Sequence, residues 1–375
     1  MTGARRGTGR VAINGAAVAS AFGRGVEPLL AAALDGTPGF RPVERFDVSD
    51  RRVGVAAVAP GAPVLADGLA RVIEEACDSA GLSAARRAHC PLFLAIHGDP
   101  DLARAVGAER TEHGADAFAA AVARRAGLSG VVRAYTSACV ASATAVADAA
   151  AMIARDRADC IVVAAGYFVD ADQFALFDAG RALAPDGRVR PFSAGRSGLL
   201  LGDGAGAVVL GSASSRTLGR LVGWGRAGDA YHVCRPRPDG DGLARAIVAA
   251  LLRADLRPEQ IDYVNAHGSG TPHSDPAETA ALYQALGEYA AAVPVSSTKS
   301  VHGQALEAGG MLELIVSLFA LRAGALPVNA GYLGPDENCE LDLVLEPREA
   351  DDAEYALSVN SAFGGANTAL LVGAP

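Results

Sequence analysis

The chain of 375 residues contains six cysteines, yet no two of them form a CxxC pair. Scattered cysteines disfavour a zinc site and a disulfide framework, and they are consistent with a reducing cytoplasm. The sequence also lacks an apolar run of about 20 residues and the pattern of a signal peptide, so we expect neither a membrane span nor export. An excess of basic residues is missing as well: the formal net charge is -9, which argues against a general nucleic-acid binder.

Hydrophobic residues and glycine are abundant, at 50% of the chain and 44 residues respectively. This composition suits a large α/β core with many tight turns. Short apolar runs flanked by glycine predict buried strands near Val11, Pro91 and Cys160. Helical patterns lie between them at 69–80 and 140–154. We therefore expect an α/β fold with a mostly parallel sheet covered by helices.

The alternation of strands and helices starts again after a polar segment at 211–219. An opening strand follows this segment, and a helical pattern at 242–254 comes next. Two successive α/β patterns of similar size, with no Pro/Ser-rich linker between them, indicate two halves that pack as one body. We place these halves at residues 1–213 and 214–375.

A candidate nucleophile, Cys139, lies in the segment RAYTSACVASATAVADAAAMIA. A β-rich stretch ends near Tyr135, and Thr136 and Ser137 are residue types that cap helices. Cys139 is therefore expected at or near the first turn of a helix, where the dipole and free N–H groups favour a thiolate and lower the thiol pKa. The same N–H groups can stabilise an oxyanion on an attached thioester.

Three further motifs lie in the second half of the chain. YVNAHGSGTPHSDPAETAAL begins at Tyr263 and places His267 in a glycine-rich turn after a strand. VPVSSTKSVHGQALEAGGMLELIVSLFAL begins at Val293 and leads from a short strand through Lys299 into a long apolar helix. ALSVNSAFGGANTALLV begins at Ala356 and predicts two strands joined by a tight glycine turn. Each residue alone is more often structural than functional, so its meaning depends on the motifs taken together.

These blocks, in this order, resemble the elongating class of β-ketoacyl-acyl-carrier-protein synthases of fatty-acid and polyketide assembly. The resemblance extends from about Val11 to Val372 and includes RPFSAGRSGLLLGDGAGAVVL from Arg190 and DAYHVCRPRPDGDG from Asp229. It implies a thiolase fold, in which two related halves form a five-layered αβαβα core. It also implies an acyltransferase that works with an acyl-carrier protein and usually forms a homodimer.

The resemblance assigns catalytic roles to three residues and a supporting role to a fourth. Cys139 matches the nucleophile that takes the acyl chain from the carrier. His267 matches the histidine that assists decarboxylation of a malonyl thioester and stabilises the enolate. Lys299 matches the lysine that orders the site, and Glu313 matches its acidic partner.

Four more residues acquire binding roles from the same resemblance. Ser269 and Thr271 match hydroxyl residues that bind the phosphopantetheine arm of the carrier. Phe363 matches a gating phenylalanine, and the backbone of Phe363 and Gly364 belongs to the glycine turn that helps Cys139 to form an oxyanion hole. No metal or cofactor is implied beyond the pantetheine of the carrier.

One departure from the family pattern concerns the second catalytic histidine, because this chain has Gln304 at the matching position. An amide cannot act as a general base or become cationic near neutral pH, but its N–H₂ group can donate to an enolate oxygen. His302, two residues earlier, is a candidate substitute imidazole. Glu307 stands where the family usually has glycine, and Ala362 replaces the first glycine of the gate.

The first half is also shorter than in typical members between about Asp50 and Val131, where the family places much of its dimer side and acyl pocket. Three functions stay open at this point. The first is a decarboxylative condensing enzyme, in polyketide or other specialised biosynthesis. The second is an acyltransferase or cyclising enzyme that keeps Cys139 and has lost decarboxylation. The third is a non-catalytic, chain-length-type subunit that pairs with a second ketosynthase-like chain in a heterodimer.

Overall fold

A computed structural model describes residues 11–61, 63–98 and 114–375. Its main feature is a sheet of 12 strands. Five of the main strands, β1, β5, β6, β7 and β8, come from the first half, and helices α2, α4 and α5 lie between the first four. Their bounds are β1 Ala12–Ser20, α2 Leu65–Ser79, β5 Leu92–Ala95, α4 Ala115–Arg125, β6 Val132–Tyr135, α5 Ala141–Ile153, β7 Cys160–Tyr167 and β8 Gly204–Gly211.

The second half repeats this succession of elements. Strands β9, β10, β11, β15 and β16 enter the same sheet, and helices α7, α8 and α10 connect the first four. Their bounds are β9 Gly219–Gly228, α7 Asp241–Ala254, β10 Tyr263–Asn265, α8 Ser274–Leu286, β11 Pro294–Ser296, α10 Gly309–Ala323, β15 Tyr355–Ser361 and β16 Ala366–Gly373.

Shorter elements join these units or lie beside them. They are β2 Gly23–Arg24, α1 Val26–Asp35, β3 Phe40–Pro42, β4 Val55–Ala57, α3 Ala84–His89, η2 Ala138–Val140, α6 Ala171–Ala179, η3 Pro258–Gln260, η4 Gly287–Ala291, α9 Lys299–His302, η5 Leu306–Ala308, β12 Ala325–Leu326, β13 Asp342–Leu343 and β14 Arg348–Glu349. Two of them, η2 and η5, immediately precede the long helices α5 and α10, and they become important at the site.

Strand order is the same in the two halves. It is β6-β5-β7-β8-β1 in the first and β11-β10-β15-β16-β9 in the second, and β1 pairs with β9 where the halves meet. In each half the first three strands in this order are parallel, and the last two run antiparallel to their neighbours. The expectation of a mostly parallel sheet is therefore wrong. The sheet is mixed because β7 pairs antiparallel with β8, and β15 with β16, so these neighbours do not need the crossover connection that parallel strands require.

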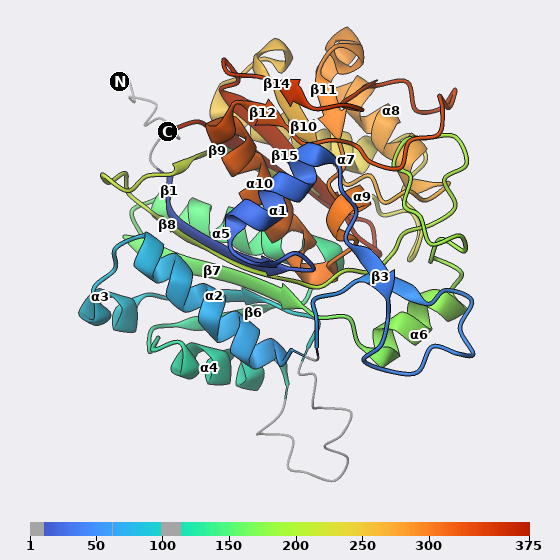
Figure 1. The fold of residues 1–375 in the computed structure, drawn as a ribbon. Coiled ribbons are helices and arrows are strands. Elements are labelled where there is room, and N and C mark those ends of the chain that lie inside the picture. Colours follow the sequence, from blue (N-terminus) through green and yellow to red (C-terminus); the bar gives the residue numbers. More distant parts are fainter. Residues whose placement is uncertain (1–10, 62, 99–113) are drawn as a thin grey trace.

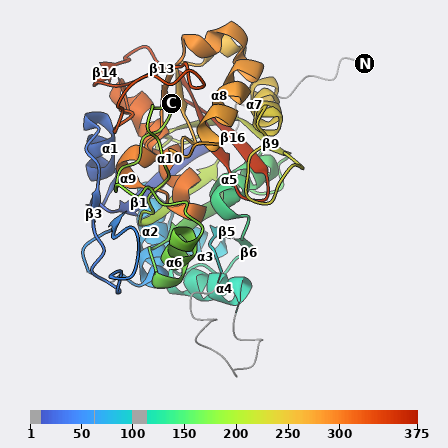
Figure 2. The same ribbon diagram turned by 90° about the vertical axis from the view of Figure 1, so that its right-hand side faces the viewer.

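The arrangement forms five layers, as Figures 1 and 2 show. Helices α2 and α4 cover one outer face, α7 and α8 cover the opposite outer face, and α5 and α10 lie between the two halves of the sheet. Helix α10 is apolar around nearly its whole circumference, and twelve of its residues are buried. Helix α5 is rich in alanine, which permits close packing in the same layer. This is the thiolase-like α/β fold that the sequence predicts.

Most predicted elements occur within a few residues of their expected positions. The pattern at 69–80 is α2, that at 140–154 is α5, and that at 242–254 is α7. The proposed boundary at residue 213 falls between β8 and β9, and the repeated strand order supports it. Residue 62 and residues 99–113 lie outside the described residues, and both fall between Asp50 and Val131, where the first half is expected to be shorter than in the family. The shortening therefore stays a prediction. No helix in the described part of the chain is long and apolar enough to cross a membrane.

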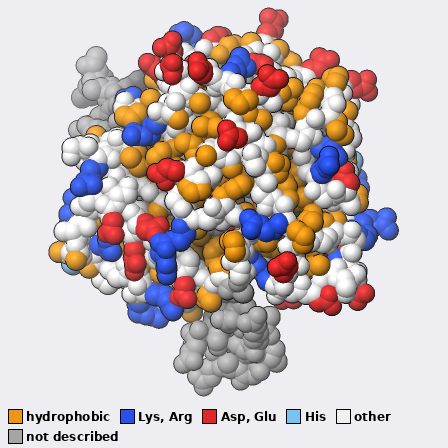
Figure 3. All heavy atoms as spheres, viewed as in Figure 1, with side chains coloured by type: hydrophobic (Ala, Val, Ile, Leu, Met, Phe, Trp, Pro, Cys, Tyr) orange, Lys and Arg blue, Asp and Glu red, His pale blue; other side chains and the backbone are white. Residues whose placement is uncertain are grey.

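Acidic and basic side chains are interspersed on the face drawn in Figure 3, with hydrophobic side chains between them. This mixture agrees with a chain whose 42 acidic residues only moderately outnumber its 33 basic ones.

Candidate active site

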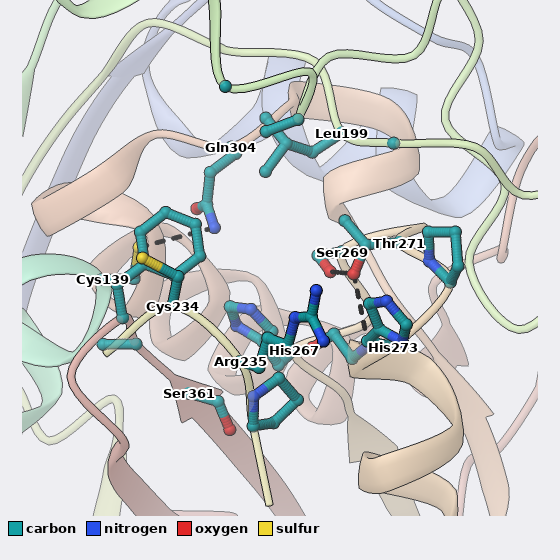
Figure 4. A pocket seen from close by; sticks show the side chains of 18 of the residues that line it. Cys139, Leu199, Cys234, Arg235, His267, Ser269, Thr271, His273, Gln304 and Ser361 are labelled. Carbon is teal, nitrogen blue, oxygen red and sulfur yellow. Dashed lines mark hydrogen bonds between the residues drawn. The ribbon is translucent and has the colours of Figure 1, made fainter. Parts of the chain in front are cut away.

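A cavity of about 290 Å³ lies where the two halves meet. The first half contributes Cys139 to its wall, and the second half contributes His267, Ser269, Thr271, Gln304 and Phe363. In Figure 4 the side chain of Gln304 points toward the sulfur of Cys139, and Ser269 and Thr271 lie together beside His273. The structure thus brings together six of the predicted site residues from separate strand ends. Open α/β sheets place ligands at such strand ends.

Cys139 lies in the 3₁₀ turn η2, two residues before α5 begins. The preceding residue, Ala138, has a left-handed φ of 52°, a strained conformation that the surrounding packing must enforce. Gln304 Nε2 donates to Cys139 Sγ over 3.7 Å. The local structure therefore aims the partly buried thiol into the cavity and gives it an amide partner.

The pKa of Cys139 is raised to about 12, mainly by burial and next by the Glu307 carboxylate. The charge of Lys299 and the N–H of Cys139 itself lower the pKa, but they do not compensate. The expectation of a lowered thiol pKa is therefore wrong. The reason is that removal of the thiolate from water outweighs the favourable helix start.

His267 lies two residues beyond the end of β10 and is buried. Its backbone N–H donates to Glu278 Oε1 over 2.6 Å, and the N–H of Gly268 donates to Glu278 Oε2 over 2.7 Å. Burial raises the pKa of Glu278 to about 8. Burial, followed by the charge of Lys299, holds the pKa of His267 well below its usual value. The ring is therefore neutral at pH 7 and can donate a hydrogen bond to an oxygen in the cavity.

Lys299 begins α9, and its ammonium forms a buried ion pair with Glu313 of α10. Asn360 of β15 donates to the second oxygen of the same carboxylate. Neither charged residue is among those that line the cavity. The ion pair therefore acts on the site from behind the wall: the Lys299 charge lowers the pKa values of Cys139 and His267.

Two hydroxyls of the His267 turn meet in the cavity. Ser269 Oγ and Thr271 Oγ1 lie 3.0 Å apart. Asp275 fixes the turn by accepting from Gly270 N over 3.1 Å and from Phe192 N over 2.8 Å. The pair can therefore offer hydrogen bonds to a polar group that enters the cavity.

Phe363 is 53% exposed, and its ring stacks on Phe177 with centroids 6.1 Å apart. The N–H of Gly364 donates to Val233 O over 2.8 Å. This bond occupies the N–H of Gly364, so it is not available to an oxyanion in this conformation. The N–H groups of Cys139 and Phe363 are left as the candidates for that role.

His302 is fully buried, and both ring nitrogens already have partners. Nδ1 lies 2.8 Å from Gly303 O, and Nε2 lies 3.0 Å from Thr298 Oγ1. Burial lowers the pKa of His302 to about 3. His302 does not line the cavity, which argues against the hypothesis that it substitutes for the missing imidazole.

Sequence reasoning missed several residues that the fold brings to the site. Arg181 and Arg235 line the cavity together with Cys234. His97 follows the end of β5 and reaches Glu307. His97 had a signal in the sequence, because it closely follows a buried strand, and parallel strands end at the same edge of a sheet. Arg235 lies within the motif that begins at Asp229, but nothing in the sequence placed it or Arg181 at the cavity.

A partly buried cysteine before a buried helix, facing a neutral histidine across a cavity in a thiolase-like fold, defines a condensing type of acyltransferase. Family models agree: residues 69–216 match "Beta-ketoacyl synthase, N-terminal domain" and residues 218–332 match "Beta-ketoacyl synthase, C-terminal domain". The chain is 32% identical to 3-oxoacyl-[acyl-carrier-protein] synthase 2 of Coxiella burnetii, over 97% of this chain and 98% of that protein. The chain therefore belongs to the β-ketoacyl synthase family.

Two other relatives extend this picture. Nodulation protein E of Rhizobium meliloti is 38% identical over 68% of this chain and 64% of that protein. The solved structure titled "The ishigamide ketosynthase/chain length factor" superposes with a TM-score of 0.88 and 29% identity, and the match covers 98% of this chain and 99% of that chain. The full length of the fold is thus shared with ketosynthases.

Proposed function

We propose that this chain loads an acyl group from an acyl-carrier protein onto Cys139 and extends it with a malonyl-type unit by decarboxylative Claisen condensation, in polyketide or other specialised biosynthesis. The observation that carries the proposal is the contact between Gln304 Nε2 and Cys139 Sγ, at 3.7 Å. This contact supports a site in which the Gln304 amide takes the position that the second catalytic histidine has in the family. The variant triad is then Cys139, His267 and Gln304.

In the first step the sulfur of Cys139 attacks the thioester carbonyl of the acyl carrier. The bond from the carbonyl carbon to the pantetheine sulfur breaks, and the pantetheine thiol leaves with the proton from Cys139. The N–H groups of Cys139 and Phe363 are the proposed donors to the intermediate oxyanion. Ser269 and Thr271 are proposed to hold the pantetheine arm, since their hydroxyls line the cavity.

In the second step a malonyl carrier enters and loses carbon dioxide. The electrons of the broken carbon–carbon bond pass to the thioester oxygen, and neutral His267 and the Gln304 amide donate hydrogen bonds to the resulting enolate. The enolate carbon attacks the acyl carbon on Cys139. The bond to the Cys139 sulfur then breaks, which leaves a β-ketoacyl carrier and a thiolate that takes up a proton.

Two arginines at the mouth of the cavity support the proposal that an acyl-carrier protein is the partner. Arg181 and Arg235 are exposed there, and both line the cavity. A guanidinium can pair with the phosphate that joins pantetheine to its carrier. Localisation in the cytoplasm and assembly as a homodimer, or as a heterodimer with a second ketosynthase-like subunit, stay predictions. Native mass spectrometry of the purified chain, alone and with such a subunit, separates the two assemblies.

Intact-mass spectrometry tests the proposed reaction. The protein is incubated with carriers that bear candidate acyl chains, and malonyl carrier is then added. We expect a mass increase on the enzyme that is absent in Cys139→Ala, followed by a β-ketoacyl product on the carrier. Acylation without carbon dioxide release would contradict condensation.

The second candidate is an acyltransferase that passes the acyl group from Cys139 to an oxygen, nitrogen or sulfur acceptor. Gln304 favours it, because the loss of an imidazole impairs decarboxylation more than acylation. Carbon dioxide release from malonyl carrier, measured for wild type and for Gln304→His, decides between the two functions. A condensing enzyme releases carbon dioxide already as the wild-type protein. A transferase releases none, and it still loads Cys139. A non-catalytic subunit would load no acyl group at all.

A further inference from the structure

A buried carboxylate, Glu307, lies beside the nucleophile and has no role in the reaction described above. Its side chain is 3% exposed, and its Oε2 has no hydrogen-bond partner among the described residues. An ionised carboxylate that is removed from water without full pairing is destabilising. The site keeps this costly group where the family pattern has glycine.

The backbone fixes Glu307 relative to Cys139. Glu307 lies in η5, which packs against η2, the turn that carries Cys139. The residue before Glu307 is Leu306, with a left-handed φ of 43°, just as Ala138 precedes Cys139 with a φ of 52°. Side-chain-bearing residues adopt this conformation only where the surrounding structure enforces it. The two strained turns hold the carboxylate and the thiol in a defined relation.

His97 connects Glu307 to solvent. His97 Nδ1 lies 3.0 Å from Glu307 Oε1, and the His97 side chain is 57% exposed. The hydrogen bond with Glu307 raises the pKa of His97. Gln173 Nε2 lies 3.0 Å from His97 Nε2, which suits a neutral ring. A half-turn of the Gln173 amide would present its oxygen to a protonated ring instead.

We propose that Glu307 and His97 form a charge pair that sets the thiolate fraction of Cys139 and thereby the rate at which the enzyme is loaded. When His97 is neutral, the charge of Glu307 is unbalanced and opposes the thiolate. When His97 is protonated, the pair is neutral and the opposition falls. Both are positioning residues, because they act through Cys139. The inference rests on the proposed function only in taking Cys139 as the nucleophile.

Other charges near the pair do not replace it. Lys299 and Glu313 form a closed ion pair, and their charges act on the pKa of Cys139 in opposite directions. Among the described residues, further titratable or charged groups are Asp170, whose charge acts on His97, Tyr167, on which Glu307 acts, and the cavity residues Arg181, Asp229, Cys234, Arg235, His267 and His273. Glu307 is the second largest influence on the pKa of Cys139, after burial.

The rate of Cys139 alkylation by iodoacetamide tests the proposal, because it needs neither carrier nor acyl chain. Peptide mass spectrometry follows the rate from about pH 6 to 10, a range around the usual thiol pKa, and Cys234, an exposed thiol of the same cavity, serves as the internal reference. We expect Glu307→Gln to speed Cys139 alkylation at pH 8 about tenfold, the factor that corresponds to one pKa unit. His97→Gln should slow Cys139 alkylation at the acidic end of the range, where the His97 ring is protonated, and Cys234 should react as before.

The double variant Glu307→Gln/His97→Gln provides the decisive comparison. If His97 acts through Glu307, the double variant reacts like Glu307→Gln, and the effects are not additive. Glu259→Gln, an exposed substitution, is the matched control and should leave the profile unchanged. Additive effects, or a Cys139 profile in Glu307→Gln that matches wild type, would overturn the proposal. Should Glu307→Gln fail to fold, an unchanged profile in His97→Gln would overturn it as well. Loading of Cys139 by acyl carriers is a separate measurement, so failure of the proposed reaction stays distinguishable.

Discussion

The two halves of the molecule have the same strand order but use corresponding strand ends differently. His97 stands two residues beyond β5, and His267 stands two residues beyond β10, the strand at the corresponding place in the second half. His267 is buried and lines the cavity, whereas His97 is exposed, does not line the cavity and contacts Glu307. A duplicated fold thus supplies equivalent positions, and burial decides which chemistry each can perform.

The same contrast holds at the central helices. The turn η2 before α5 carries the nucleophile, and the segment before α10 carries Lys299 and Gln304. The first half therefore presents the thiol, and the second half presents Lys299 and Gln304, the groups proposed to act on it. Neither half contains a complete site, so the reaction depends on how they pack together.

The largest expected losses of stability concern two buried ion pairs, one in each half. Lys299 pairs with Glu313 in the second half, and Arg45 pairs with Asp203 over 2.7 Å in the first. Lys299→Met and Arg45→Met should each lower the free energy of unfolding by about 3–5 kcal/mol, because each leaves a buried carboxylate unpaired. Urea unfolding measures this loss.

The rate of Cys139 alkylation distinguishes these two variants. Only Lys299→Met should also change the alkylation profile of Cys139, since Lys299 acts on that thiol. The control is Arg24→Met, whose partner Glu75 is partly exposed, and we expect a loss of about 0–1 kcal/mol. Equal losses in all three variants would contradict the contrast between buried and exposed pairs.

Adjacent leucines of α7 test whether the outer layer of the second half is as tightly packed as its core. Leu251 is buried, and Leu252 is 77% exposed. Leu251→Ala should cost about 2–5 kcal/mol of stability because it leaves a cavity. Leu252→Ala should change stability by less than about 0.5 kcal/mol. The midpoints of denaturant unfolding check both values, provided that the slope of the free energy of unfolding against denaturant concentration stays constant.

A pair of glycines tests the equivalence of the halves directly. A Cβ on Gly15 of β1 would lie 2.2 Å from Ala76 O of α2, and one on Gly225 of β9 would lie 1.9 Å from Ala246 O of α7. Gly15→Ala and Gly225→Ala should each cost about 1–3 kcal/mol, because strand and helix must separate. Gly334→Ala, where a Cβ meets nothing within 4 Å, is the matched control. A large loss in only one of the first two would show that the halves are packed differently.

The last prediction concerns the pH dependence of stability at His302, whose pKa falls from 6.5 to about 3 on burial. The unfolded chain binds a proton at this residue below pH 6.5, and the folded chain does not until about pH 3. Stability from His302 is therefore complete above pH 6.5 and is lost as the pH falls toward 3. We expect the stability difference between wild type and His302→Gln to narrow from about pH 7 to about pH 4.5. A constant difference in urea unfolding would contradict this.

Particular residues show how far prediction from sequence reached. Local patterns predicted a cysteine before a helix, a histidine in a turn and a lysine before a long apolar helix, and the family resemblance made them site residues. The structure places Cys139 and His267 in one cavity and Lys299 behind its wall. The direction of the thiol pKa was not predicted correctly. Local sequence contains the helix start that favours a thiolate, but it contains neither the burial nor the Glu307 carboxylate that outweigh it.

By itself, the sequence determined the period of its helices and strands, the position of its turns and the residue types available at each strand end, because these depend on near neighbours in the chain. Tertiary structure alone decided the antiparallel pairing of β7 with β8 and of β15 with β16, the exclusion of His302 from the cavity and the contact of His97 with Glu307. These features join residues up to 210 positions apart. Their energies depend on distance and burial in the folded molecule, and neither quantity is encoded in a local pattern.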